Sequence, residues 1–162
     1  MTGRRRHTRL FLATLAVAAL ATLAWAQWRH DHARATLLTL DPATVSRISV
    51  RWQGQPTRHY VHRDGRWRDA DDPDAGVDAA RLARLAGLAA TPVLQWRHAD
   101  SMDATRVGLA APALRVTLDD EVLEWGSLTA LGPQRFVRVG RRIAIVPAAY
   151  SPRPPGDSSQ KS

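Results

Sequence analysis

The sequence predicts an α+β fold in which an N-terminal transmembrane helix precedes an antiparallel β-hairpin and meander domain packed on one main helix. Three observations predict it. Residues 10–28 carry no charge, several segments between residues 44 and 146 alternate apolar with polar residues, and residues 78–89 repeat apolar residues at helical spacing. Hairpins with a single helix between them are typical of a sheet whose apolar face is covered by that helix.

Residues 10–28 are long enough to cross a membrane as one helix. The stretch LFLATLAVAALATLAWAQW contains no charged residue, and as a helix it would span about 28 Å, close to the hydrocarbon thickness of a bilayer. Four Arg lie before it, in the basic segment 1–9, which the positive-inside rule leaves in the cytoplasm. We therefore expect a single-pass protein of a bacterial inner membrane whose C-terminal domain lies in the periplasm.

A cleavable signal peptide is the competing interpretation of the same stretch. Its cleavage site would be Ala24-Trp25-Ala26, immediately before Gln27. Both interpretations export residues 29–162. We favour the retained helix, with Leu10 to Trp28 as the contact with the membrane, because its length matches a complete span.

Composition narrows the function classes. The chain contains no Cys, which excludes disulfides and thiolate metal sites. Its net charge is +8, and the four Arg of residues 1–9 contribute half of it. The remaining charge forms no basic stripe on one predicted element, so we expect no nucleic-acid partner.

The exported part divides into three segments. Residues 29–40 are expected to be a juxtamembrane spacer, because Asp41-Pro42 interrupts the chain directly after them. Residues 41–150 carry the periodic patterns and form the α+β domain. Residues 151–162, SPRPPGDSSQKS, are expected to be a disordered tail, since they contain too little apolar side chain to pack.

The first half of the domain predicts three strands and one helix. Residues 48–52 alternate, and residues 57–63 and 66–68 flank Asp64-Gly65, which favours a two-residue hairpin. Asp78 is a favourable N-cap, and Thr91-Pro92 ends the helix that it begins. The apolar stripe of this helix consists of Leu82, Leu85, Leu88 and Ala89.

The second half predicts a β-meander. Asp119-Asp120 and Gly140-Arg141 are expected at two of its turns, and Gly126 is expected to end a strand. We expect strands at 93–96, 114–118, 122–125, 135–139 and 142–146, with a short helix within 99–106.

The order of these motifs resembles a bacterial envelope family, the domain of unknown function 4340. The resemblance covers Asp41 to about Pro147. It implies a membrane-anchored auxiliary protein of the kind associated with gliding or with transporters, with no shared active site. The family usually has an acid before the proline of its Gly-Leu segment, where this chain has Ala110 and Ala111. The motifs are Leu40-Asp41-Pro42, Asp64-Gly65-Arg66-Trp67, Val77-Asp78 leading into Leu82, Leu85 and Leu88, Gly108-Leu109-Ala110-Ala111-Pro112, Trp125-Gly126 and Arg135-Phe136-Val137-Arg138.

No set of residues in the sequence predicts catalysis or a cofactor. His59 and His62 lie on opposite faces of a strand, and His30-x-His32 has no third ligand nearby in the sequence. The acids of residues 69–76 lack the spacing of a calcium loop. We therefore predict no catalytic residue, no metal ligand and no cofactor.

Aromatic side chains on strands offer the best candidates for binding. Trp52, Trp96 and Trp125, with Arg135 and Arg138, could form an aromatic platform for a sugar or a peptide. The interpretation that we favour places Trp side chains in the core, because one indole ring buries much apolar area in a small domain. Trp67 is expected to be one such core residue.

These observations favour a non-enzymatic interaction domain, an accessory component of an envelope or transporter-type assembly. Its partner would be another envelope protein that binds the sheet or adds a strand to its edge. The alternative is a glycan- or peptidoglycan-binding module that uses Trp and Arg residues. A periplasmic hydrolase is the least favoured class, and a small-molecule ligand is not predicted.

The first prediction concerns the N-terminus. An alkaline phosphatase fused after Tyr150 should be active, because the domain is exported, and the mass of the mature protein should include residues 10–28. An inactive fusion would contradict the predicted topology, and a mature N-terminus at Gln27 would show a cleaved signal peptide.

Overall fold

The computed structural model describes residues 35–130 and 132–154. The predictions for residues 1–9 and 10–28, and for most of the spacer, lie outside the described residues. The contacts between residues divide the chain into two compact units, and the second unit begins at Ala35. Within the described ranges, no helix is long and apolar enough to cross a membrane.

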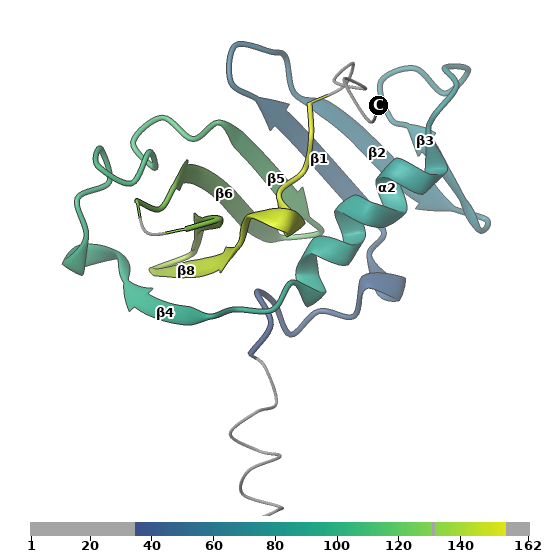
Figure 1. Ribbon diagram of the computed structural model, residues 1–162. Coiled ribbons are helices and arrows are strands. Elements are labelled where there is room, and N and C mark those ends of the chain that lie inside the picture. The colour runs from purple at the N-terminus through teal and green to yellow at the C-terminus, as the bar shows by residue number, and fades with distance from the viewer. Residues whose placement is uncertain (1–34, 131, 155–162) are drawn as a thin grey trace, which may run out of the picture. The chain divides into compact units, whose positions relative to one another are not determined.

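The fold of this unit is one antiparallel sheet of eight strands, in the order β3-β2-β1-β5-β6-β7-β8-β4, with one short α-helix (Figure 1). The predicted α+β class is confirmed. The strands are β1 (Arg47–Trp52), β2 (Arg58–Arg63), β3 (Arg66–Asp69), β4 (Gln95–His98), β5 (Leu114–Leu118), β6 (Glu121–Leu128), β7 (Gln134–Val139) and β8 (Arg142–Pro147).

Local signals set the tight turns as predicted. Asp64 and Gly65 both have positive φ, 52° and 73°, which matches the twist of a two-residue hairpin. Asp119 has φ 52° and Gly140 has φ 55°, and each begins the two-residue turn of its own hairpin. The residues in the turns therefore fix the register of three hairpins.

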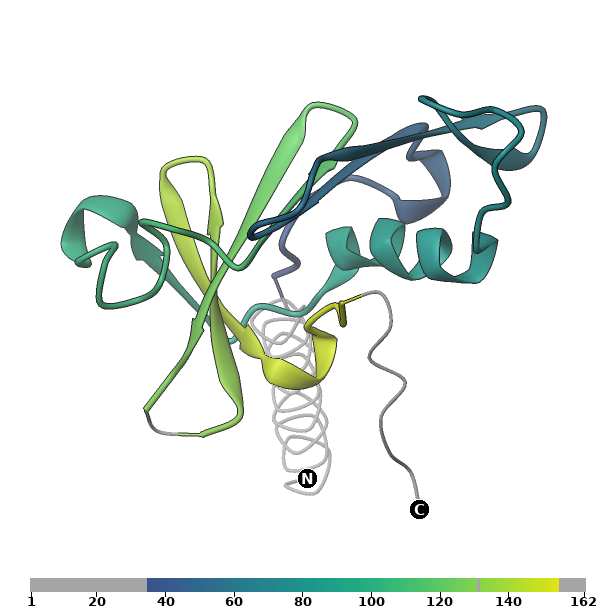
Figure 2. The same ribbon diagram turned by 90° about the horizontal axis from the view of Figure 1, so that it is seen from above.

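The helix α2 (Ala79–Ala86) begins as the sequence predicts. The Asp78 carboxylate accepts a hydrogen bond from the Arg81 N–H at 2.9 Å, which satisfies one of the unpaired donors at the start of a helix. A 3-10 turn, η2 (Gly87–Ala90), extends it toward Thr91. Figure 2 shows α2 along one face of the half-sheet β1, β2 and β3.

The core lies between the sheet and α2. Leu82, Leu85 and Leu88 from the helical segment pack with alternate residues of the strands, among them Ile48 and Val116, which are fully buried. Trp67, which is expected in the core from the sequence, is half-buried and packs against the edge of this core. The continuous apolar face supplies most of the free energy that holds the helix on the sheet.

A second segment covers part of the opposite face of the sheet, over β6, β7 and β8. Val107 and Leu109 pack there on Ile143, with Phe136 partly buried beside them, in a second and smaller core cluster. The segment that supplies the first two of these residues connects η3 (Ala99–Ser101) to β5.

Gly126 does not end its strand, contrary to the prediction, because β6 continues to Leu128. A Cβ at Gly126 would lie 2.2 Å from the Val107 carbonyl oxygen. The glycine therefore allows the 107–109 segment to cross close to the strand, and the Ser127 N–H donates to that same carbonyl at 2.9 Å. Close approach of two backbones, not strand termination, explains this glycine.

The predicted strand 93–96 is displaced by two residues. The strand β4 spans Gln95–His98 and forms the sheet edge beside β8. Pairing with β8, which lies far along the sequence, sets its position. The helix predicted within 99–106 is reduced to the 3-10 turn η3, because the backbone becomes extended at Met102.

The spacer prediction is wrong for its last six residues. Leu37 and Leu38 are 2% and 7% exposed in the main core, and their N–H groups donate to the carbonyl oxygens of Thr91 and Ala89. The packing unit therefore begins at Ala35. At the other end of the domain, Ser151 to Pro154 have described positions beside α2, while residues 155–162 lie outside the described ranges.

The second prediction follows from this boundary. Leu37→Ala should lower the free energy of unfolding by about 2–5 kcal/mol, because it leaves a cavity in the core. Thr39→Ala, at an exposed position, should change it by less than about 0.5 kcal/mol. Denaturant unfolding followed by Trp fluorescence measures both, and equal effects would contradict the assignment of Leu37 to the core.

Candidate functional site

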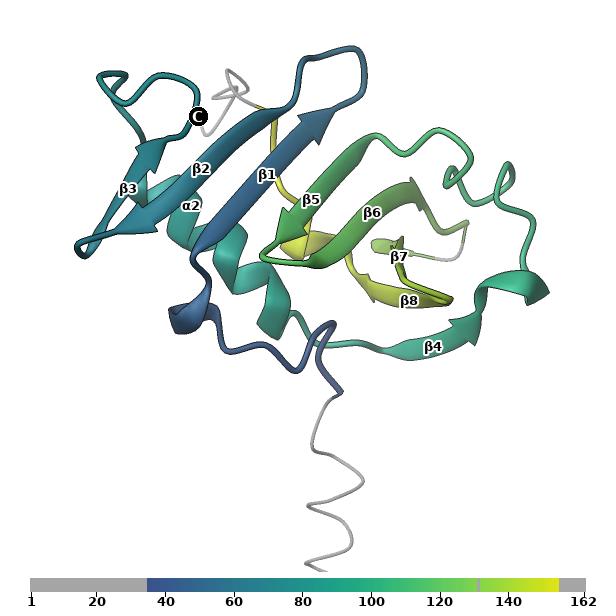
Figure 3. The same cartoon turned by 180° about the vertical axis from the view of Figure 1, so that it is seen from behind.

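Figure 3 shows that no helix covers one face of β1, β2, β3 and β5. This face continues over β6 to Arg138 on β7, and many of its side chains are Arg. Its side chains alternate with the core residues along each strand, so strand register defines the set. Arg51, Arg63 and Arg66 are exposed. We call this surface the Arg face; its basic residues are Arg47, Arg51, Arg63, Arg66, Arg68, Arg115 and Arg138.

A buried carboxylate holds two of these Arg. Glu124 lies in register between Arg115 on β5 and Arg138 on β7. Arg115 Nε donates to Glu124 Oε1 at 2.9 Å, and Arg138 binds the other carboxylate oxygen, Oε2. The Glu124 side chain is only 7% exposed. Two charge-assisted partners offset the cost of removing this carboxylate from water.

The Arg face carries an excess of positive charge. Arg51 lies directly across from Arg115, a like-charge pair that destabilises a sheet unless something else compensates it. Glu124 neutralises one charge of the row formed by Arg51, Arg115 and Arg138. Within the described residues, Arg51, Arg63, Arg66 and Arg68 make no ion pair.

Only the rim of the Arg face carries further acids. Arg47 pairs with Asp120 at 3.1 Å. Burial, the largest single influence, raises the pKa of the neighbouring Asp119 carboxyl, but hydrogen bonds from Ser46 and from the Arg47 N–H, together with the Arg47 charge, outweigh it. The pKa of Asp119 therefore lies below its ordinary value of 3.8. This carboxylate stays ionised at neutral pH and fastens the start of β1 to the β5–β6 turn.

The acids of residues 69–76 form a hydrogen-bonded turn. The Asp69 carboxylate accepts hydrogen bonds from the N–H groups of Asp71 and Asp72, at 2.9 and 3.2 Å. No group of three or more His and acidic residues in the described part of the chain is arranged to hold a metal ion. His59 lies on the Arg face beside Ser49, whereas His62 lies beside Trp67 on the core face.

The predicted aromatic platform is dispersed across the sheet. Trp125 is 1% exposed in the core, so its ring is not available to a ligand. Trp96 lies on the edge strand β4, where the Arg142 guanidinium stacks on its ring at 4.1 Å. Four strands separate Trp96 from Trp52. Arg135 is half-buried, and Arg138 is bound to Glu124.

Trp52 lines a small cavity between the sheet and α2. The cavity has a volume of about 340 Å³. Arg58, Tyr60 and Asp69 also line it, and the buried indole N–H of Trp52 has no hydrogen-bond partner among the described residues. Of the predicted platform, Trp52 is therefore the side chain that borders this cavity.

Sequence reasoning identified Arg138 but missed Arg115 and Glu124. The signal was a single acid between the apolar residues Leu123 and Trp125, on the polar side of the alternation. That signal gains meaning only when the strand registers place an Arg on each side of the acid.

Comparison with known proteins adds no functional assignment, because no family model, curated protein or solved structure matches this chain.

The third prediction tests the buried carboxylate. Glu124→Gln should lower the free energy of unfolding by about 2–4 kcal/mol, because it leaves two neighbouring Arg without a counter-charge. Glu121→Gln, at an exposed position of the same strand, should have an effect below about 0.5 kcal/mol. Denaturant unfolding compares them, and an unchanged stability of Glu124→Gln would show that the Arg pair needs no such neutralisation.

Proposed function

We propose that this chain is a non-enzymatic accessory component of a bacterial envelope assembly. Residues 10–28 anchor it in the inner membrane, and the α+β domain lies in the periplasm. The domain binds an acidic surface of another envelope protein through the Arg face. The resemblance of its motifs to the domain of unknown function 4340 agrees with this role.

The observation that carries the proposal is the charge of the Arg face. Four exposed Arg on three neighbouring strands lack ion-pair partners within the described residues. Holding so many like charges on one surface destabilises the free domain. An acidic partner would neutralise them, and planar guanidinium groups suit bidentate contacts with carboxylates.

The position of the face at a sheet edge extends the contact. Arg66 and Arg68 lie on β3, which pairs only with β2. A partner strand with acidic side chains could therefore add to β3 while its carboxylates meet the Arg side chains. Backbone hydrogen bonds would supply affinity, and charge would supply selectivity.

The cavity at Trp52 favours the alternative function. Stacking on an indole ring and hydrogen bonds to Arg58 and Asp69 are contacts that suit a sugar. A glycan- or peptidoglycan-binding module would use this cavity and not the Arg face. Substitutions at the two places therefore distinguish the two functions.

The fourth prediction tests the acidic partner. The double variant Arg51→Glu, Arg68→Glu should lose the partner that cross-links to the native chain in membranes, because the face would then repel carboxylates. Arg141→Glu changes an exposed Arg of the β7–β8 turn and should retain it. Quantitative mass spectrometry after affinity purification compares the three chains.

Salt provides a second measurement. Capture by the native chain should weaken about tenfold or more between 50 and 500 mM salt, because exposed charge pairs are screened. Capture that survives the double variant would overturn the role of the Arg face. Binding of peptidoglycan fragments that is lost in Trp52→Ala would favour the alternative.

A further inference from the structure

A second and larger cavity also borders α2. It has a volume of about 710 Å³ and lies between the helix and residues 149–154, which comprise the end of η4 (Ala148–Tyr150) and the segment after it. That volume is within the range of small-molecule sites, about 300–1,000 Å³. Three of its lining residues, Asp78, Arg81 and Leu85, also line the cavity at Trp52. None of the basic residues of the Arg face lines it.

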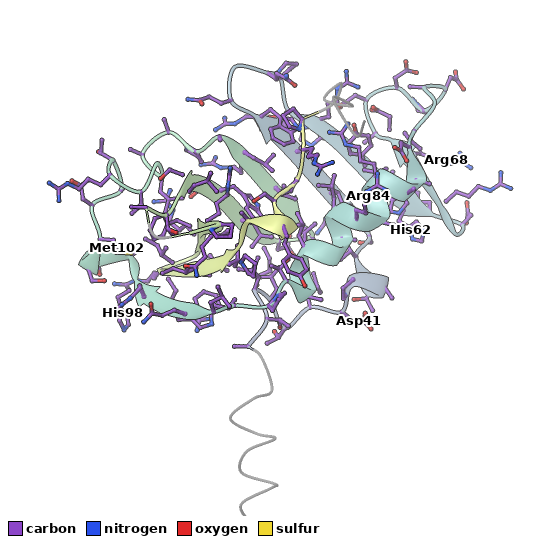
Figure 4. All side chains as sticks on the ribbon, viewed as in Figure 1. Asp41, His62, Arg68, Arg84, His98 and Met102 are labelled. Carbon is purple, nitrogen blue, oxygen red and sulfur yellow. The ribbon has the colours of Figure 1, made fainter. Side chains whose placement is uncertain are left out.

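The polar side of the cavity is cationic. Arg81 and Arg84 come from α2, one turn apart, and Arg153 comes from the C-terminal segment. Figure 4 labels Arg84 on the helix. Among the described residues, Asp78 is the only acid in the lining. Its Oδ1 already caps the helix, and its Oδ2 is 4.0 Å from Arg84, the limit of an ion pair. The lining therefore carries two positive charges in excess.

Two hydroxyl groups in the same wall lack partners. Thr91 is 2% exposed, and neither its side-chain oxygen nor that of Ser151 has a hydrogen-bond partner among the described residues. Both residues line the cavity. Buried hydroxyls are nearly always hydrogen-bonded, because removing a polar group from water without a new hydrogen bond costs free energy.

The remaining wall is apolar. Leu85 and Leu88 form its floor from the helical segment, and Tyr150 lies at its C-terminal side, 47% exposed. An exposed aromatic ring beside two Leu side chains can cover an apolar group of a ligand. Charge and apolar surface thus occur in one cavity.

We propose that this cavity binds a small amphipathic anion, a carboxylate or phosphate group joined to one compact apolar group. The Arg side chains bind the anionic group, and the apolar group packs on Leu85, Leu88 and Tyr150. The carboxyl terminus of a peptide and a phosphate monoester share this chemistry.

Four probe molecules test separately whether binding needs the negative charge, whether it needs the apolar group, and whether the ligand is a peptide carboxyl terminus or a phosphate monoester. The full chain in phosphatidylcholine bilayer discs is titrated with N-acetyl-phenylalanine, a mimic of a peptide carboxyl terminus, and with phenyl phosphate. N-acetyl-phenylalaninamide keeps the shape of the first and removes its charge, and inorganic phosphate keeps the charge of the second and removes its ring. Leu methyl resonances report binding at Leu85 and Leu88.

We expect saturable shifts with at least one of the two amphipathic anions, and affinity for it about tenfold or more above that for its matched control. Tighter binding of N-acetyl-phenylalanine assigns the site to peptide carboxyl termini, and tighter binding of phenyl phosphate assigns it to phosphate monoesters. No shift with either anion, or equal affinity for anion and control, overturns the proposal.

Variants locate the site. Arg84→Gln combined with Arg153→Gln should weaken binding about tenfold or more, whereas Arg106→Gln, at an exposed position outside the cavity lining, should not change it. Unchanged affinity in the double variant would show that the anion binds elsewhere and would overturn the proposal.

Discussion

The pairing of β1 with β5 is the constraint on which the rest of the domain depends. It joins two strands separated by more than sixty residues in the chain, in register from Ile48↔Leu118 to Trp52↔Leu114. Without it, the hairpins β1–β3 and the meander β5–β8 would be separate small sheets, each too small to bury its apolar face well. With it, the core residues of both halves form one surface, and α2 has a complete face to cover. Such a pairing requires closing a long loop, and the chain entropy lost in closing it is offset only after the contacts between the two strands form.

The same register creates the Arg face. Once Ile48, Val50 and Trp52 point to the core, the alternate residues of β1 must point away from it, and the strands on each side follow. Arg51 then meets Arg115, and Arg115 meets Glu124, whose second neighbour is Arg138. A shift of one residue between β1 and β5 would bury these charges, so the ion-pair row also opposes the wrong register. Stability and the charged surface are thus consequences of one alignment.

The two sides of α2 suggest different uses of one helix. Its apolar stripe packs in the core. Arg81 and Arg84 line the cavity that the C-terminal segment borders. The segment that follows η4 is therefore part of the architecture at least to Pro154. A domain with a broad cationic face and a separate cavity lined by Arg side chains suits recognition of anionic groups, by surface contact in one place and by enclosure in the other.

The sequence by itself determined the elements whose causes are local. The Asp64-Gly65 hairpin, the Asp78 cap and the alternation of β1, β5 and β8 depend on residues within a few positions of one another, and each is where the sequence predicted it. Only the tertiary structure decided the position of β4, the core location of Leu37 and Leu38, the continuation of β6 through Gly126, and the burial of Glu124 between two Arg. Each of these depends on a partner distant in the chain, with which local propensity has no connection. The dispersal of Trp52, Trp96 and Trp125 has the same reason, because strand order, which the alternation pattern does not encode, sets the distance between side chains that share a face.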